Sequence, residues 1–191
     1  GEKPNRSCLI SGLGQWYDSD SVIHFADYRM NVTNSYSIRQ LNDTESVCLS
    51  PELNLHEIAD ITQRKFVPAE IIGYGRLSLM TMANCPLKAS GHCMKKDATI
   101  YIRDRKKQKF LIMCNKGCIA ELINSKPIYM ADKWRDIEKS GVDFVRLIFT
   151  IEDADECRHI IHAYKSAAEG KIVEPMPENT FTRGHFYRGV I

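Results

Sequence analysis

Short apolar runs of strand length alternate with helical patterns along most of this chain, and this alternation restricts its fold more than any other feature. The clearest run is 142–149, after which Asp153 begins a helical pattern that Gly170 closes. The run 69–74 follows a helical pattern over 55–64 in the same way. Strands that alternate with helices pair in parallel, because each helix carries the chain back across the sheet. We therefore expect an α/β fold.

The expected elements are too few for a closed barrel. The expected strands are 21–28, 46–50, 69–74, 127–130 and 142–149. The expected helices are 38–41 after Ser35 or Ser37, 55–64 after Asn54, 132–140 begun by Asp132, and 154–169 begun by Asp153. A closed eight-stranded barrel of such units takes about 250 residues, whereas this chain has 191. We expect one domain, 1–191, that forms an open or half barrel.

The alternation of strands and helices is interrupted between residues 75 and 117, where no helical periodicity is present. Runs 99–103 and 109–113 predict a two-stranded hairpin that turns at 105–108. A short helix is expected over 118–123. We interpret 76–126 as an inserted module, placed directly after a strand of the α/β series.

Four of the seven cysteines, Cys85, Cys93, Cys114 and Cys118, fall within this module. Thiols that crowd together usually share a metal ion or a disulfide. A zinc site is usually built from two short Cys-x2-4-Cys units, and only Cys114 and Cys118 have that spacing. An iron-sulfur cluster accepts wider spacings, because its irons can take thiolates from separate loops. Four unrelated thiols remain a third interpretation.

The module is also strongly basic. It carries eleven Lys and Arg residues against three acids, a local charge of +8, whereas the whole chain has a net charge of +2. Such a patch is typical of proteins that bind phosphates. Arg103, Arg105 and Lys106 are the candidate RNA contacts, and Tyr101 lies among them where a base could stack. A charged hairpin that is only a solvated surface is the alternative.

Polar residues at strand ends form a second candidate group. In a parallel barrel the pocket lies at the carboxyl ends of the strands. Glu52 is the candidate general acid or base, and Arg76 the candidate clamp for a carboxylate or phosphate. The candidate substrate-binding residues at such ends are Asn31, Asn34 and Arg146.

The residues around the cysteines resemble a known family. The motifs are Gly75-Arg-Leu-Ser-Leu-Met80, Asn84-Cys-Pro-Leu87, Ser90-Gly-His-Cys93, Ile102-Arg-Asp-Arg-Lys106, Phe110 and Ile123-Asn-Ser-Lys-Pro127, with flanking motifs at 31–35, 50–54 and 181–184. In this order they look like the signature region of the collagenase-like peptidases, peptidase family U32. The resemblance covers nearly the whole chain.

The resemblance implies a TIM-like barrel whose first strands would precede Gly1. It also implies that four cysteines hold a 4Fe-4S cluster: Cys85, Cys93 and Cys118 match the family positions, and Cys114 is the nearest fourth thiol. Members of the family hydroxylate tRNA or rRNA, with prephenate as a co-substrate, take part in quinone biosynthesis, or are described as proteases. The peptidase signature has an acidic residue before the first cysteine, where this chain has 73–76, Gly-Tyr-Gly-Arg.

These observations favour an iron-sulfur-dependent enzyme that modifies RNA and uses a small carboxylate co-substrate. A collagenase-like protease and a metal-stapled binding module without catalysis are the alternatives, with zinc as the alternative metal. No Gly-x-Ser-x-Gly or His-Glu-x-x-His motif supports proteolysis. The absence of an 18-residue apolar run argues against a membrane span. Seven is an odd number of cysteines, which makes a secreted disulfide framework the weaker interpretation, and we expect a cytoplasmic protein. Exposed edges of a half barrel predict a homodimer.

Overall fold

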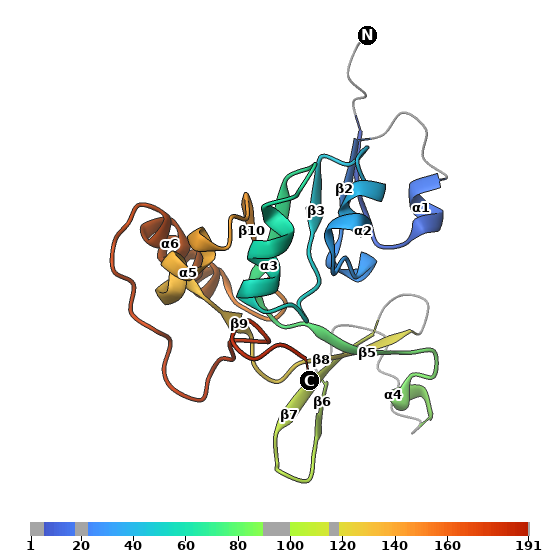
Figure 1. Cartoon of the computed structure of the whole chain (residues 1–191). Coiled ribbons are helices and arrows are strands. Elements are labelled where there is room, and N and C mark those ends of the chain that lie inside the picture. Colours follow the sequence, from blue (N-terminus) through green and yellow to red (C-terminus); the bar gives the residue numbers. More distant parts are fainter. Residues whose placement is uncertain (1–5, 18–22, 90–99, 115–118, 191) are drawn as a thin grey trace.

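Two sheets form the framework of the protein in this computed structural model, which describes residues 6–17, 23–89, 100–114 and 119–190. Figure 1 shows the larger, parallel sheet with its helices, and the smaller, antiparallel sheet projecting away from it. The smaller sheet is built entirely from the segment between the fourth and ninth strands. The segment that the sequence predicts as an insertion therefore forms its own antiparallel sheet, and its strands do not pair with those of the parallel sheet.

The larger sheet has five parallel strands in the order β1-β2-β3-β4-β10. These strands are β1 (Ser7–Ile10), β2 (Ile23–Ala26), β3 (Ser46–Cys48), β4 (Ala69–Gly75) and β10 (Phe144–Leu147). A sixth strand, β9 (Ile128–Tyr129), pairs antiparallel with the end of β4. The described strands form an open sheet with β1 and β10 at its edges. The α/β class and parallel pairing are confirmed, and the described residues form no closed barrel.

The helices follow the strands, as the alternation predicts. They are α1 (Leu13–Tyr17), η1 (Tyr28–Met30), α2 (Ser35–Gln40), α3 (Leu55–Thr62), α4 (Pro86–Ala89), η2 (Ala131–Lys133), α5 (Trp134–Lys139) and α6 (Ala154–Ala168). In Figure 1, α2 and α3 lie on one face of the parallel sheet. None of the helices in the described part of the chain is long and apolar enough to cross a membrane.

Two of the expected helix caps are confirmed, and two are wrong. Asn54 and Asp153 each accept a backbone N–H of the first turn and form capping boxes. Asn34, rather than Ser35 or Ser37, caps α2. Asp132 does not cap α5, because its carboxylate binds the Arg183 guanidinium at 2.6 and 2.7 Å.

One face of the parallel sheet borders a hollow that no helix of the described chain lines. The register places Leu9 beside Phe25, and Glu70 beside both Cys48 and Phe144, so these side chains point to the same side. Leu9, Phe25 and Phe144 are 49%, 36% and 52% exposed. Together with their neighbours they border a hollow of about 540 Å³. This is the face that would point inward if such a sheet closed into a barrel.

The smaller sheet has the strand order β5-β8-β7-β6. Its strands are β5 (Ser78–Met82), β6 (Ile100–Arg103), β7 (Lys109–Cys114) and β8 (Ala120–Ile123). The predicted hairpin is confirmed as β6 and β7. The helix expected over 118–123 is wrong, because residues 120–123 pair with β5 and β7 as strand β8. Residues 120 and 123 are buried there, so pairing within the sheet outweighs the local helical pattern.

Candidate functional site

Two cysteines from distant parts of the module meet at the base of the hairpin. Cys85 lies between β5 and α4, and Cys114 is the last residue of β7. Their Sγ atoms are 3.5 Å apart. A disulfide requires about 2.05 Å, so the two residues are present as separate thiols.

The antiparallel sheet explains why these two thiols meet. Residues Ile112 and Ala120 are buried in neighbouring strands, and Cys85 packs against both of them with 5% of its surface exposed. Cys114 pairs with Ala120 in the ladder between β7 and β8, which places its exposed thiol beside Cys85. The other two candidate ligands, Cys93 and Cys118, lie outside the described residues. Within the described ranges, no three His, Cys, Asp or Glu side chains gather as a metal site.

The separation of the two thiols can be compared with the geometry of each metal interpretation. Two thiolates bound at about 2.3 Å to one tetrahedral ion lie about 3.8 Å apart, close to the separation of Cys85 and Cys114. A cluster binds its thiolates to different irons, so the two side chains would have to turn apart to accept one. Both metal interpretations from the sequence therefore stay open.

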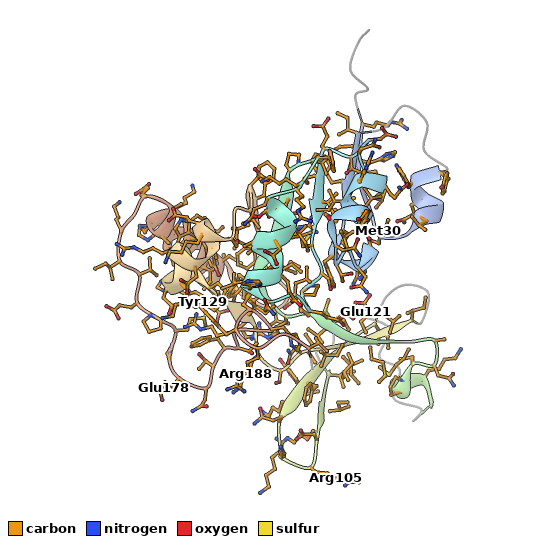
Figure 2. All side chains as sticks on the ribbon, viewed as in Figure 1. Met30, Arg105, Glu121, Tyr129, Glu178 and Arg188 are labelled. Atoms are coloured by element: carbon orange, nitrogen blue, oxygen red, sulfur yellow. The ribbon has the colours of Figure 1, made fainter. Side chains whose placement is uncertain are left out.

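The basic residues predicted to contact RNA lie on the hairpin beyond this pair. Figure 1 shows β6 and β7 projecting from the body of the molecule, and Figure 2 labels Arg105 at the tip. Arg103, Arg105 and Lys106 are all exposed. Asp104 shapes the turn, because its Oδ1 accepts the N–H of Gln108 at 2.9 Å. The tip therefore keeps a rigid turn beneath its cations.

Arg76 lies at the carboxyl end of β4, as predicted, but it pairs with a residue that the sequence did not single out. Its guanidinium forms an ion pair with Glu152, and the Tyr74 hydroxyl donates to the same carboxylate oxygen at 3.1 Å. The other oxygen of Glu152 accepts the N–H of Thr150 at 2.6 Å and that of Ile151 at 3.0 Å. The groups that contact this carboxylate are thus hydrogen-bond donors.

These contacts explain the ionisation of the group. Partial burial acts to raise the pKa of Glu152, but the backbone N–H groups and Arg76 outweigh it and hold that pKa below its usual range. Burial, followed by the charge of Glu152, raises the pKa of Tyr74. Glu152 is therefore an ionised carboxylate that accepts a hydrogen bond from the protonated Tyr74 hydroxyl. The same carboxylate holds Arg76 at the strand end.

Arg146 lies within β10 and connects three strands. It binds Glu70 of β4 through two nitrogens and Asp27, directly after β2, through a third at 2.6 Å. Cys48 of β3 is buried beside this group, and burial raises the pKa of its thiol to about 12. Arg146 therefore has a structural role in the described sheet, and the 540 Å³ hollow lies over it.

The remaining strand-end candidates are not brought together. Asn34 Oδ1 accepts the N–H of Ser37 at 2.9 Å and caps α2. Asn31 is exposed with φ 51°, which ends η1. Glu52 is exposed after β3, and its N–H donates to Ser50 Oγ at 3.3 Å. No hydrogen bond or ion pair joins Glu52 to Arg76 among the contacts of the described chain.

The acids that hold the two arginines were missed in the sequence. Asp27, Glu70 and Glu152 belong to this group, and all three lie in or just beyond strands. One signal was available: an arginine in an apolar strand needs a carboxylate nearby, because an unpaired buried charge is costly. The sequence does not identify which carboxylate it is, because the partners are 76 to 119 positions away.

A comparison with protein families places these elements in a known context. The sequence profile of peptidase family U32 matches residues 19–184, which include the smaller sheet, every strand of the larger sheet except β1, and the helices from η1 to α6. No curated protein and no solved structure gives a significant match.

Proposed function

This chain belongs to peptidase family U32, and we propose that it is part of an enzyme that modifies RNA, in particular an iron-sulfur-dependent hydroxylase of tRNA or rRNA. Its role in this proposal is to hold a metal centre at the base of a basic hairpin. The hairpin then contacts the RNA backbone close to that centre.

The observation that carries this proposal is a pair of like charges in the hairpin. Arg103 lies directly opposite Lys109 at the end of the β6–β7 ladder. Like charges at opposed positions destabilise a sheet, so the sequence maintains an unfavourable contact there. A phosphate placed between the two cations would relieve their repulsion and gain two charge-assisted contacts.

The surrounding residues suit the same ligand. Tyr101 is 46% exposed and lies two residues before Arg103, so the ring and the guanidinium point to one face of the strand. An exposed ring beside cations can stack on an unpaired base. Arg105 and Lys106 extend the positive surface at the turn. These residues supply both parts of a single-stranded RNA contact, the backbone charge and the base.

The metal centre of the proposal is formed by Cys85, Cys114 and the two cysteines outside the described residues, Cys93 and Cys118. A 4Fe-4S cluster at this position would supply one-electron chemistry, and zinc would supply only a structural staple. The chain itself contributes the thiol pair and the rigid sheet that carries it. Glu52 is the proposed acid or base, because it is exposed on the carboxyl side of β3. Arg76 and Arg146 are the proposed positioning groups for a small carboxylate co-substrate.

RNA binding in the presence and absence of the charge pair tests this proposal. We expect the double substitution Arg103→Gln/Lys109→Gln to weaken binding of a single-stranded oligonucleotide. Log affinity decreases with log salt concentration, and we expect this negative slope to be smaller in magnitude by roughly 1.4 in the double variant. The difference is about 0.7 for each lost phosphate contact. The measurement is fluorescence anisotropy of the whole chain at several salt concentrations.

A matched control removes the same charge elsewhere. Arg64 and Lys133 are exposed and lie outside the module, so Arg64→Gln/Lys133→Gln should leave the salt slope unchanged. Equal effects of the two double variants would show that only net charge matters, and the proposal would then be wrong. Turnover of gelatin by the same preparation, lost on Glu52→Gln, would instead support the protease alternative.

A further inference from the structure

A cavity of the described chain lies away from both the Cys85–Cys114 thiol pair and the hairpin. It has a volume of about 910 Å³ and is formed between α6 and the extended segment 172–180, with Tyr74 and Tyr129 at its floor. Sites for small organic molecules generally occupy 300–1,000 Å³ and combine apolar walls with a few polar groups. The cavity therefore has the size and form of a ligand site.

The walls of this cavity are apolar, and its charged groups are mainly acidic. Ile160 and Ala163 of α6 face Val173 and Met176 of the extended segment. Four carboxylates line the cavity against one guanidinium, a formal charge of −3 with the two lining histidines left aside. The whole chain, by contrast, is +2. The cavity is thus a locally negative site on a chain of positive charge.

Only one of the lining carboxylates is neutralised by a lining cation. Glu152 is buried and ion-paired with Arg76, so this guanidinium is already bound to an anion. Asp155 pairs with Arg158 at the surface, where both side chains are more than 70% exposed and water screens the interaction. Glu156 caps α6, and Glu174 is exposed on the opposite wall. Three lining carboxylates therefore remain without a lining cation.

We propose that this cavity binds a small organic cation, an amine attached to an apolar or aromatic body. The apolar walls would take the body, and the carboxylates at the rim would hold the ammonium group. The cavity shares Arg76 with the RNA-modification proposal, but binding of a cation is measured without RNA, so the two proposals can fail separately.

Three dansyl probes that share one body and differ in charge test the proposal. Dansylcadaverine carries an amine, its N-acetyl derivative is neutral, and dansyl-6-aminohexanoate is an anion. Binding of each to the whole chain is measured by dansyl emission and anisotropy. We expect the cation to bind at least about tenfold more tightly than the neutral probe, because each of the nearby carboxylates contributes roughly threefold at solvent-exposed distances.

Charge and shape variants locate the binding. Asp155→Asn/Glu174→Gln should lower the affinity for the cationic probe about tenfold and leave the affinity for the neutral probe unchanged. Glu45→Gln/Asp60→Asn removes the same charge from exposed positions that do not line the cavity, and it should change the affinity less than twofold. Ser166→Phe places a ring in the cavity from α6 and should abolish binding of the cation.

Amide chemical shifts of the unmodified chain provide a readout that needs no variant. Dansylcadaverine should shift the amide signals of residues 159–177 at lower concentrations than those of the hairpin. The proposal is overturned if the neutral or anionic probe binds this segment as tightly as the cation. It is equally overturned if the cation causes no shifts there.

Discussion

Arg146 Nη1 donates a hydrogen bond to Asp27 Oδ1 at 2.6 Å, which joins two strands of the parallel sheet that are 119 positions apart in sequence. The same guanidinium binds the carboxylate of Glu70 on the intervening strand β4. Asp27 is only 3% exposed. The three groups form one charge network in which Arg146 binds two carboxylates, and Arg29 lies 3.9 Å from the other oxygen of Asp27.

The first prediction is that Arg146→Met strongly destabilises the fold. The substitution leaves Asp27 and Glu70 with no cation from β10, and removal of one partner of a buried ion pair costs about 3–5 kcal/mol. The free energy of unfolding in urea measures this loss. Arg158→Met breaks an ion pair that is largely exposed, so it should cost less than about 1 kcal/mol. Similar losses in the two variants would show that the Arg146 network is not a structural centre.

The second prediction concerns acid stability and Glu152. Its pKa in the folded chain is held below the ordinary value, despite the opposing effect of burial, by backbone N–H groups and Arg76. A lowered folded pKa stabilises the fold above the unfolded value of about 4.3 and ceases to do so as the pH falls through the folded pKa. Glu152→Gln should therefore destabilise the protein most at pH 7. Its deficit relative to the unmodified chain should shrink as the pH falls below about 4.3.

Urea unfolding at pH 7 and at successively lower pH values measures this difference. Asp60 forms an exposed pair with His56, so Asp60→Asn is a suitable control. The difference in free energy of unfolding between this variant and the unmodified chain should hardly change over the same pH range. A deficit of Glu152→Gln that grows on acidification would contradict the assigned direction of the pKa shift.

Local sequence signals predicted the elements of this fold better than their partners. The α/β alternation, the caps at Asn54 and Asp153, and the β6–β7 hairpin follow from patterns within some fifteen residues, and the structure confirms them. The strand β8 was expected as a helix, because its pairing with β5 and β7 is a contact between segments that a local pattern does not contain. Asp132 was misassigned for the same reason, since its partner Arg183 is 51 positions away.

The residues of the candidate site show the same difference between local signals and contacts of distant segments. The crowding of the thiols predicted that cysteines of the module would meet, and Cys85 and Cys114 do so. Arg76 directly follows β4 and Arg146 lies within β10. Their carboxylate partners depend on the order of strands in the sheet. A single sequence specifies which charges need partners, and only the fold specifies which residues are those partners.

The third prediction is that Gly75→Ala disrupts the junction of β4 and β10. Gly75 has φ +131°, a conformation that residues with a side chain rarely adopt, and an added Cβ would lie 2.4 Å from the carbonyl oxygen of Ile148. The backbone strain alone costs about 1–3 kcal/mol, and the steric overlap adds to it. Thermal and urea unfolding should both show the loss. Gly12→Ala, at a site with no atoms within 4 Å, should change stability by less than about 1 kcal/mol.

The fourth prediction concerns the metal. Cys85→Ser should lower metal affinity by more than roughly tenfold, since even changes to residues that only support ligands cost 10–100-fold. The chain is purified without oxygen, and its iron, sulfide and zinc contents are measured together with its visible spectrum. Loss of iron, sulfide and colour would identify a cluster, whereas loss of zinc from a colourless protein would identify a single ion.

A second cysteine variant shows whether the effect is specific to the thiol pair. Cys157 lies on α6, outside the module, and its Sγ donates to the carbonyl oxygen of Glu152 at 3.8 Å. Cys157→Ser should therefore leave the metal content unchanged. Metal retained in full by Cys85→Ser, or lost equally from both variants, would remove Cys85 from the ligand set. The 3.5 Å approach of Cys85 and Cys114 would then be a packing contact in the core of the smaller sheet, because both thiols lie beside Ala120.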